Sequence, residues 1–94
     1  MSYDSQISEY RKKMKKIDAA KPNIKAAIDN YQEAREELNR IKGFARCEAI
    51  KTKIGTKIAE LEELLRRMKK EYEDYEEKIR RLKRKKAEEE NAAK

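Results

Sequence analysis

Large apolar residues recur in steps of four and three over residues 54–82. The members of this series are Ile54, Ile58, Leu61, Leu65, Met68, Tyr72, Tyr75, Ile79 and Leu82. Steps that alternate between three and four place one side chain per helical turn on a narrow stripe, as at the a and d positions of a heptad. The pattern therefore predicts a long helix whose apolar stripe is covered by a second helix.

An earlier series in steps of four and three, which skips Lys21 and Arg35 but resumes in phase after each, supplies this second helix. Its members are Tyr3, Ile7, Tyr10, Met14, Ile17, Ile24, Ile28, Tyr31 and Leu38. The phase of the series is kept across Pro22, although proline removes a helical N–H and costs about 3 kcal/mol inside a helix. We therefore expect a kink or a short break near Pro22, without loss of register.

The segment Lys42-Gly43-Phe44 lies between the two series and is the predicted reversal. Gly43 can take the left-handed conformation that ends a helix, and Phe44 can cover the tip. In such a hairpin the residue numbers of facing positions have a nearly constant sum, here 85 or 86. The pairs include Tyr3 with Leu82, Ile7 with Ile79, Tyr10 with Tyr75 and Ile28 with Ile58. The sequence therefore predicts an all-α fold, an antiparallel two-helix coiled-coil hairpin.

Length and composition agree with this small fold. The chain has 94 residues, of which 48% are charged and 37% hydrophobic, too little apolar material for a multilayer core. We expect a single helical-hairpin domain over residues 1–94. Its parts would be a first arm over about 3–41, a second arm over about 45–82 and a solvated helical tail over about 83–94.

A second stripe of small and apolar residues lies beside the first series. Six residues are predicted to bind a partner, namely Ala20, Ala27, Ala34, Ile41, Ile50 and Leu64. Small residues in a row let another helix approach closely, and a two-helix core is thin. We therefore expect a helical protein partner, or a homodimer that forms a helical bundle. The alternative is that alanine serves only as a good helix former on a solvated face.

A basic segment over residues 78–86 suggests an alternative function, the binding of nucleic acid. Its seven basic residues are Lys78, Arg80, Arg81, Lys83, Arg84, Lys85 and Lys86, in a chain of net charge +7. In the hairpin only Asp4 offers this segment an opposite charge. Such a cluster can bind nucleic acid non-specifically, with strong salt dependence. Membrane-surface binding is disfavoured, because Ile79 and Leu82 are the segment's only apolar residues.

Catalysis is disfavoured, because the sequence contains no catalytic motif. There is no His, a single Cys47, and no glycine-rich phosphate loop. We expect a non-enzymatic protein with no cofactor and no metal, in which Cys47 is a small core residue. The sequence shows neither a secretory signal nor a membrane span, so we expect a cytoplasmic location, with signal-less export as an alternative.

The length, the hairpin plan and the central Gly43 resemble the small helical-hairpin proteins of type VII secretion. These include the Trp-X-Gly family and the helical partners of Leu-X-Gly toxins. The turn reads Lys42-Gly43-Phe44 in place of Trp-X-Gly, whereas Tyr72 followed four residues later by Glu76 matches the family's tail motif. The resemblance implies paired hairpins that accompany or target secreted effectors. Chaperone-type hairpins and accessory coiled coils share the same outline.

Overall fold

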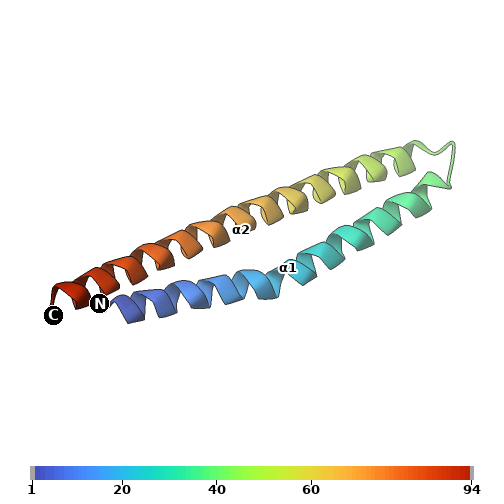
Figure 1. Cartoon of the computed structure of the whole chain (residues 1–94). Helices are drawn as coiled ribbons and strands as arrows, with labels where there is room; N and C mark the ends of the chain where they lie inside the picture. The colour runs from blue at the N-terminus through green and yellow to red at the C-terminus, as the bar shows by residue number, and fades with distance from the viewer. Residues whose placement is uncertain (1, 94) are drawn as a thin grey trace. The chain divides into compact units, whose positions relative to one another are not determined.

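The computed structural model describes residues 2–93 and consists of two long helices (Figure 1). Helix α1 spans Tyr3–Asn39 and helix α2 spans Ala45–Ala92. The described residues contain no strand. The two helices run antiparallel and pack against each other, which confirms the predicted all-α hairpin. The first helix ends two residues earlier than predicted, at Asn39.

The start of α1 is capped by a serine side chain. The Ser5 N–H donates a hydrogen bond to Ser2 Oγ at 3.2 Å, and the Gln6 N–H donates to the Ser2 carbonyl at 3.1 Å. A serine at this position satisfies an amide that has no partner inside the helix. Asp4, in the first turn, places a negative charge near the positive end of the helix dipole.

Helix α1 runs through Pro22 without a break, so of the two expected outcomes the break is excluded. Pro22 lies on the exposed side of the helix. The carbonyl of Asp18, which loses its helical N–H partner to the proline ring, can therefore bond water in place of the missing amide. This exposure explains how a proline is tolerated inside a long helix.

The reversal is built around one residue in the left-handed region. The Ile41 N–H donates to the Leu38 carbonyl at 3.1 Å and tightens the end of α1, and Gly43 follows with φ of 87°. The Phe44 carbonyl then accepts the Cys47 N–H at 3.1 Å and begins α2. The prediction that Phe44 covers the tip is wrong, because 64% of this residue is exposed.

The chain divides into two compact units, each made of paired segments of α1 and α2. The terminal unit comprises Met1–Ala19 with Met68–Lys94, and the turn unit comprises Ala20–Arg67. The residues buried in the terminal unit are Ile7, Ile17 and Ile79, and those buried in the turn unit are Ile28 and Ile58. Each unit therefore has a thin core, as the composition predicts.

The terminal unit shows one predicted pair of facing residues and one longer contact that the register did not predict. The rings of Tyr10 and Tyr75 lie 5.6 Å apart between centroids, as predicted. Tyr3, however, donates its hydroxyl to Glu89 at 2.5 Å, seven residues beyond Leu82. Side chains lean towards the N-terminus of their own helix, so long side chains of antiparallel helices meet at larger sums than their Cα atoms do.

The predicted tail is part of the hairpin. Helix α2 continues to Ala92, and Glu89 in this segment contacts α1 through Tyr3. Most of its side chains are exposed, as expected for a solvated helix. Lys94, towards which we expect the tail to fray, lies outside the described residues.

Candidate protein-interaction surface

All six predicted partner-binding residues lie in the turn unit. Those that are exposed are Ala34, Ile41, Ile50 and Leu64, and those that are half-buried are Ala20 and Ala27. The three large aliphatic residues keep similar exposure, 43% for Ile41, 46% for Ile50 and 42% for Leu64. The turn unit therefore leaves aliphatic surface in contact with solvent beside a core of only two isoleucines.

The heptad register places these residues on one side of the apolar stripe. Ala34 on α1 and Ile50 on α2 each precede an a position, which is the g position of the heptad. In an antiparallel pair the g positions of both helices border the same side. The terminal unit shows this relation directly, because the g residues Lys13 and Lys78 both lie over the ring of Tyr10. We name the small and aliphatic members of the corresponding row in the turn unit (Ala20, Ala27, Ala34, Ile50 and Leu64) the g face. Lys57, which occupies the g position between Ile50 and Leu64, is exposed and pairs with Glu60 at 3.4 Å.

A shallow groove of about 540 Å³ borders the g face on α2. Its lining residues are Thr56, Ala59, Glu60, Glu63, Leu64 and Arg67. Glu63 accepts hydrogen bonds from Arg66 Nη2 at 2.6 Å and from Arg67 Nε at 3.3 Å. The hydrogen bonds and positive charges, of Arg66 above all, hold the pKa of the Glu63 carboxyl below its usual value. The groove thus has an apolar wall at Leu64 and a charged rim that is paired within α2.

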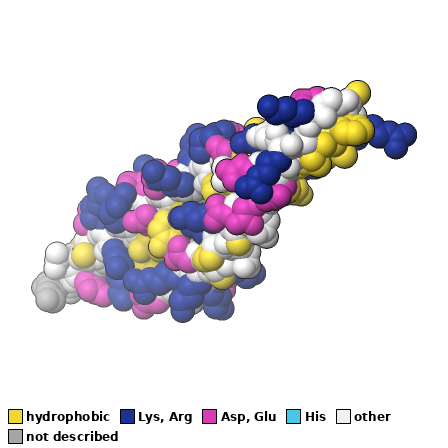
Figure 2. Space-filling view, turned by 90° about the vertical axis from the view of Figure 1, so that its right-hand side faces the viewer, with side chains coloured by type: hydrophobic (Ala, Val, Ile, Leu, Met, Phe, Trp, Pro, Cys, Tyr) yellow, Lys and Arg dark blue, Asp and Glu magenta, His cyan; other side chains and the backbone are white. Residues whose placement is uncertain are grey.

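Two further exposed hydrophobic residues were missed by the sequence analysis. Phe44 is 64% exposed and Tyr31 is 36% exposed, and both belong to the turn unit. Figure 2 shows exposed hydrophobic side chains gathered in a patch on this face of the molecule. The position of Phe44 beside the glycine of the reversal was a signal for its exposure, because this residue lies in the connection between the two helices.

The basic segment lies on α2 in the terminal unit. Its exposed members are Lys78, Arg80, Arg81, Lys83, Arg84 and Lys85, and Lys86 is half-buried. Part of its charge is neutralised within the helix, because Glu77 pairs with Arg80 Nη2 at 2.6 Å and with Arg81 Nε at 3.2 Å. These bonds lower the pKa of Glu77 and raise that of Arg80.

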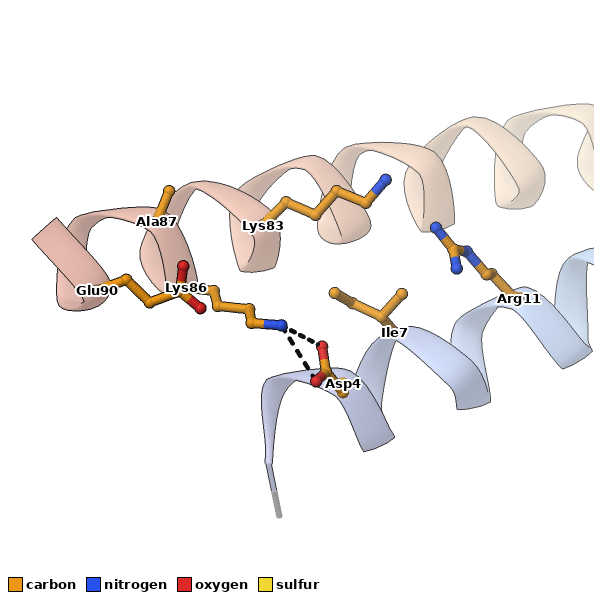
Figure 3. A pocket seen from close by; sticks show the side chains of 7 residues that line it. All are labelled: Asp4, Ile7, Arg11, Lys83, Lys86, Ala87 and Glu90. Carbon is orange, nitrogen blue, oxygen red and sulfur yellow. Dashed lines mark hydrogen bonds and ion pairs between the residues drawn. The ribbon is translucent and has the colours of Figure 1, made fainter.

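The half-buried Lys86 joins the basic segment to the start of α1. Its ammonium group bonds both carboxylate oxygens of Asp4, at 2.9 and 3.1 Å, beside Ile7 (Figure 3). The hydrogen bond and charge of Asp4 raise the pKa of Lys86. Asp4 therefore forms an ion pair with Lys86. The sequence had indicated Asp4 as the acidic residue that faces the basic segment. Within residues 2–93, Lys83, Arg84 and Lys85 have no ion-pair partner.

Two tyrosines and two lysines form a cluster in the terminal unit. The Lys78 ammonium lies 5.4 Å from the Tyr10 ring centroid and 5.6 Å from that of Tyr75. The Lys13 ammonium lies 5.9 and 5.7 Å from the same centroids. The Tyr75 hydroxyl donates to Glu71 at 2.7 Å, and this bond raises the pKa of Tyr75. The aromatic pair thus attracts a cation from each helix and ties α1 to α2.

Other chemistry is sparse in the described part of the chain. Cys47 is a free thiol and is half-buried near the reversal. Within residues 2–93, no group of three or more Cys, Asp or Glu side chains is placed to hold a metal ion. Neither helix, over its described residues, combines the length and apolar character that crossing a bilayer requires.

Comparisons with known proteins find no relative of this chain. No protein-family model matches the sequence, and neither a curated protein nor a solved structure is significantly similar to it.

Proposed function

We propose that this chain is a non-enzymatic protein-interaction module that presents the g face of its turn unit to a helical partner. The observation that carries the proposal is the exposure of Ile50 and Leu64 on α2, close to half of each residue, beside small residues of α1. Half-exposed aliphatic side chains gain roughly 1 kcal/mol each when a partner covers them. A row of alanines lets the partner's backbone come close.

The thin core of the turn unit supports this reading. Ile28 and Ile58 are its buried residues, at 9% and 5% exposure. Two helices joined by one short connection gain little from such a core, and small helical domains usually add stability by association. A helical partner laid along the g face would convert a two-helix layer into a bundle.

The partner we propose is either a second copy of this chain or another helical polypeptide. In the second case the chain would act as an accessory, targeting or chaperone-like subunit, including one that accompanies a secreted effector. The hairpin plan, the length and the central Gly43 support this role through the resemblance to secretion-associated hairpins.

The test compares the mass in solution of the full chain with that of three variants, alone and with any captured protein. Leu64→Glu and Ala34→Glu place a carboxylate on the g face, and each is expected to abolish association. Gln32→Glu is the matched control, because position 32 is exposed on α1 at an e position, across the apolar stripe from Ala34. We expect this variant to associate normally.

Two outcomes contradict the proposal. One is a wild-type chain that is monomeric and captures no polypeptide. The other is an equal loss of association in Gln32→Glu and Ala34→Glu. Circular dichroism of each variant separates the loss of a partner from the loss of the helices.

A further inference from the structure

A groove in the terminal unit runs between α1 and the basic segment of α2. Its volume is about 170 Å³, and its lining residues are Tyr10, Lys78, Arg81, Leu82 and Lys85. A neighbouring hollow of about 210 Å³ shares Arg81 and Lys85 with it and adds Arg84 and Glu88. We name the side chains of Lys78, Arg81 and Lys85 the basic groove.

The three cations of the basic groove lie on one face of α2. They occupy positions i, i+3 and i+7, and so span about 10 Å along the helix axis. Lys13 of α1 adds a fourth positive charge, because its ammonium lies over the same tyrosine rings as that of Lys78. Like charges at this spacing repel one another, so an anion in the groove would relieve the repulsion.

Neutralisation of the basic groove within the chain is incomplete. Arg81 donates from Nε to Glu77, which uses one of its five N–H groups. Lys85 has no ion-pair partner within residues 2–93. Glu88 is the acidic residue that lines the far end of the adjoining hollow. The groove itself thus keeps net positive charge that faces solvent.

We propose that the basic groove binds the phosphate backbone of a nucleic acid without reading its bases. A strand carries one phosphate per 3.4 Å of duplex axis, so the length of the groove matches about three of them. The Tyr10 ring is already engaged by Tyr75 and by two ammonium groups, which leaves it unsuited to stacking on a base. A membrane surface fits less well, because Leu82 is half-buried and Ile79 is buried.

The test measures binding of the full chain to a labelled, mixed-sequence DNA duplex by fluorescence anisotropy over a series of salt concentrations. The wild-type chain is expected to bind, with log K falling linearly against log salt. The triple variant Lys78→Gln, Arg81→Gln, Lys85→Gln loses three phosphate contacts. We expect its slope to be shallower by about 2 to 3 and its affinity at low salt to fall roughly tenfold or more.

A second triple variant controls for net charge. Lys25→Gln, Arg46→Gln, Lys53→Gln removes the same charge from exposed positions of the turn unit, and the slope should stay at its wild-type value. If both triple variants weaken DNA binding equally, or if the wild-type chain does not bind the duplex, the proposal that the basic groove binds nucleic acid is wrong. Binding to phosphatidylserine vesicles without binding to DNA would overturn the choice of nucleic acid. Leu64→Glu should bind DNA normally, so this proposal and the protein-interaction proposal fail independently.

Discussion

Two isoleucines of α2, Ile50 and Ile58, lie in the same unit and differ in burial. Ile58 is 5% exposed and Ile50 is 46% exposed. Replacing either residue by alanine removes three carbon atoms, and alanine gains up to about 0.7 kcal/mol of helix propensity at both positions. The difference between Ile58→Ala and Ile50→Ala therefore isolates the effect of burial.

The expected losses follow from the transfer energy of the three carbons. At about 0.8 kcal/mol per carbon, Ile58→Ala loses roughly 2.4 kcal/mol plus a cavity term, which leaves a net loss of about 2–3 kcal/mol after the propensity gain. For a chain of this size that corresponds to a fall in Tm of roughly 10–20 °C. Ile50→Ala removes surface that is half solvated already, so its net loss is about 1 kcal/mol or less.

Thermal and urea unfolding, followed by far-ultraviolet circular dichroism, measure both losses. The scans are repeated at a tenfold higher protein concentration. If the g face binds a second copy of the chain, Ile50→Ala also weakens the concentration dependence of Tm, whereas Ile58→Ala leaves it unchanged. Equal losses at the two positions, or a tolerated Ile58→Ala, would show that the predicted stripe is not the core.

The remaining predictions concern the two glycines and one ion-pair cluster. Gly43→Ala should destabilise the hairpin by about 1–2 kcal/mol, because φ is 87° although the added methyl would meet nothing within 4 Å. Gly55→Ala should stabilise it by about 1 kcal/mol in urea unfolding, since Gly55 is helical and has room for a methyl group. NMR titration should give Glu63 a pKa below 4.5, and Arg66→Gln should raise it while that of Glu77 stays low.

The sign of the pH effect follows from the direction of these shifts. A carboxyl whose pKa is lower in the folded chain than the ordinary value of 4.5 stabilises the fold above that value. This contribution is lost as the pH falls through the folded pKa. A Glu63 pKa at or above 4.5, or one that does not change in Arg66→Gln, would contradict the role of the Glu63–Arg66 ion pair. A stabilising Gly43→Ala would contradict the left-handed turn.

Some features of the candidate surfaces could have been predicted and were not. Glu77 lies three residues before Arg80 and four before Arg81, which is the spacing of ion pairs on one helix. The charge of the basic segment was therefore partly neutralised by a neighbour visible in the sequence. The exposure of Phe44 was also implied by its place beside the glycine of the reversal.

The sequence by itself determined the two helices, their antiparallel pairing and the turn at Gly43. Helical periodicity is a local property, and a short connection leaves the two stripes only one register in which both are covered. Only the tertiary structure decided which side chains of the two helices meet. Lys13 and Lys78 share the same tyrosine rings, and the Tyr3 hydroxyl bonds Glu89. These contacts depend on the length and direction of individual side chains across the helix pair. The spacing of residues along the sequence does not specify either property.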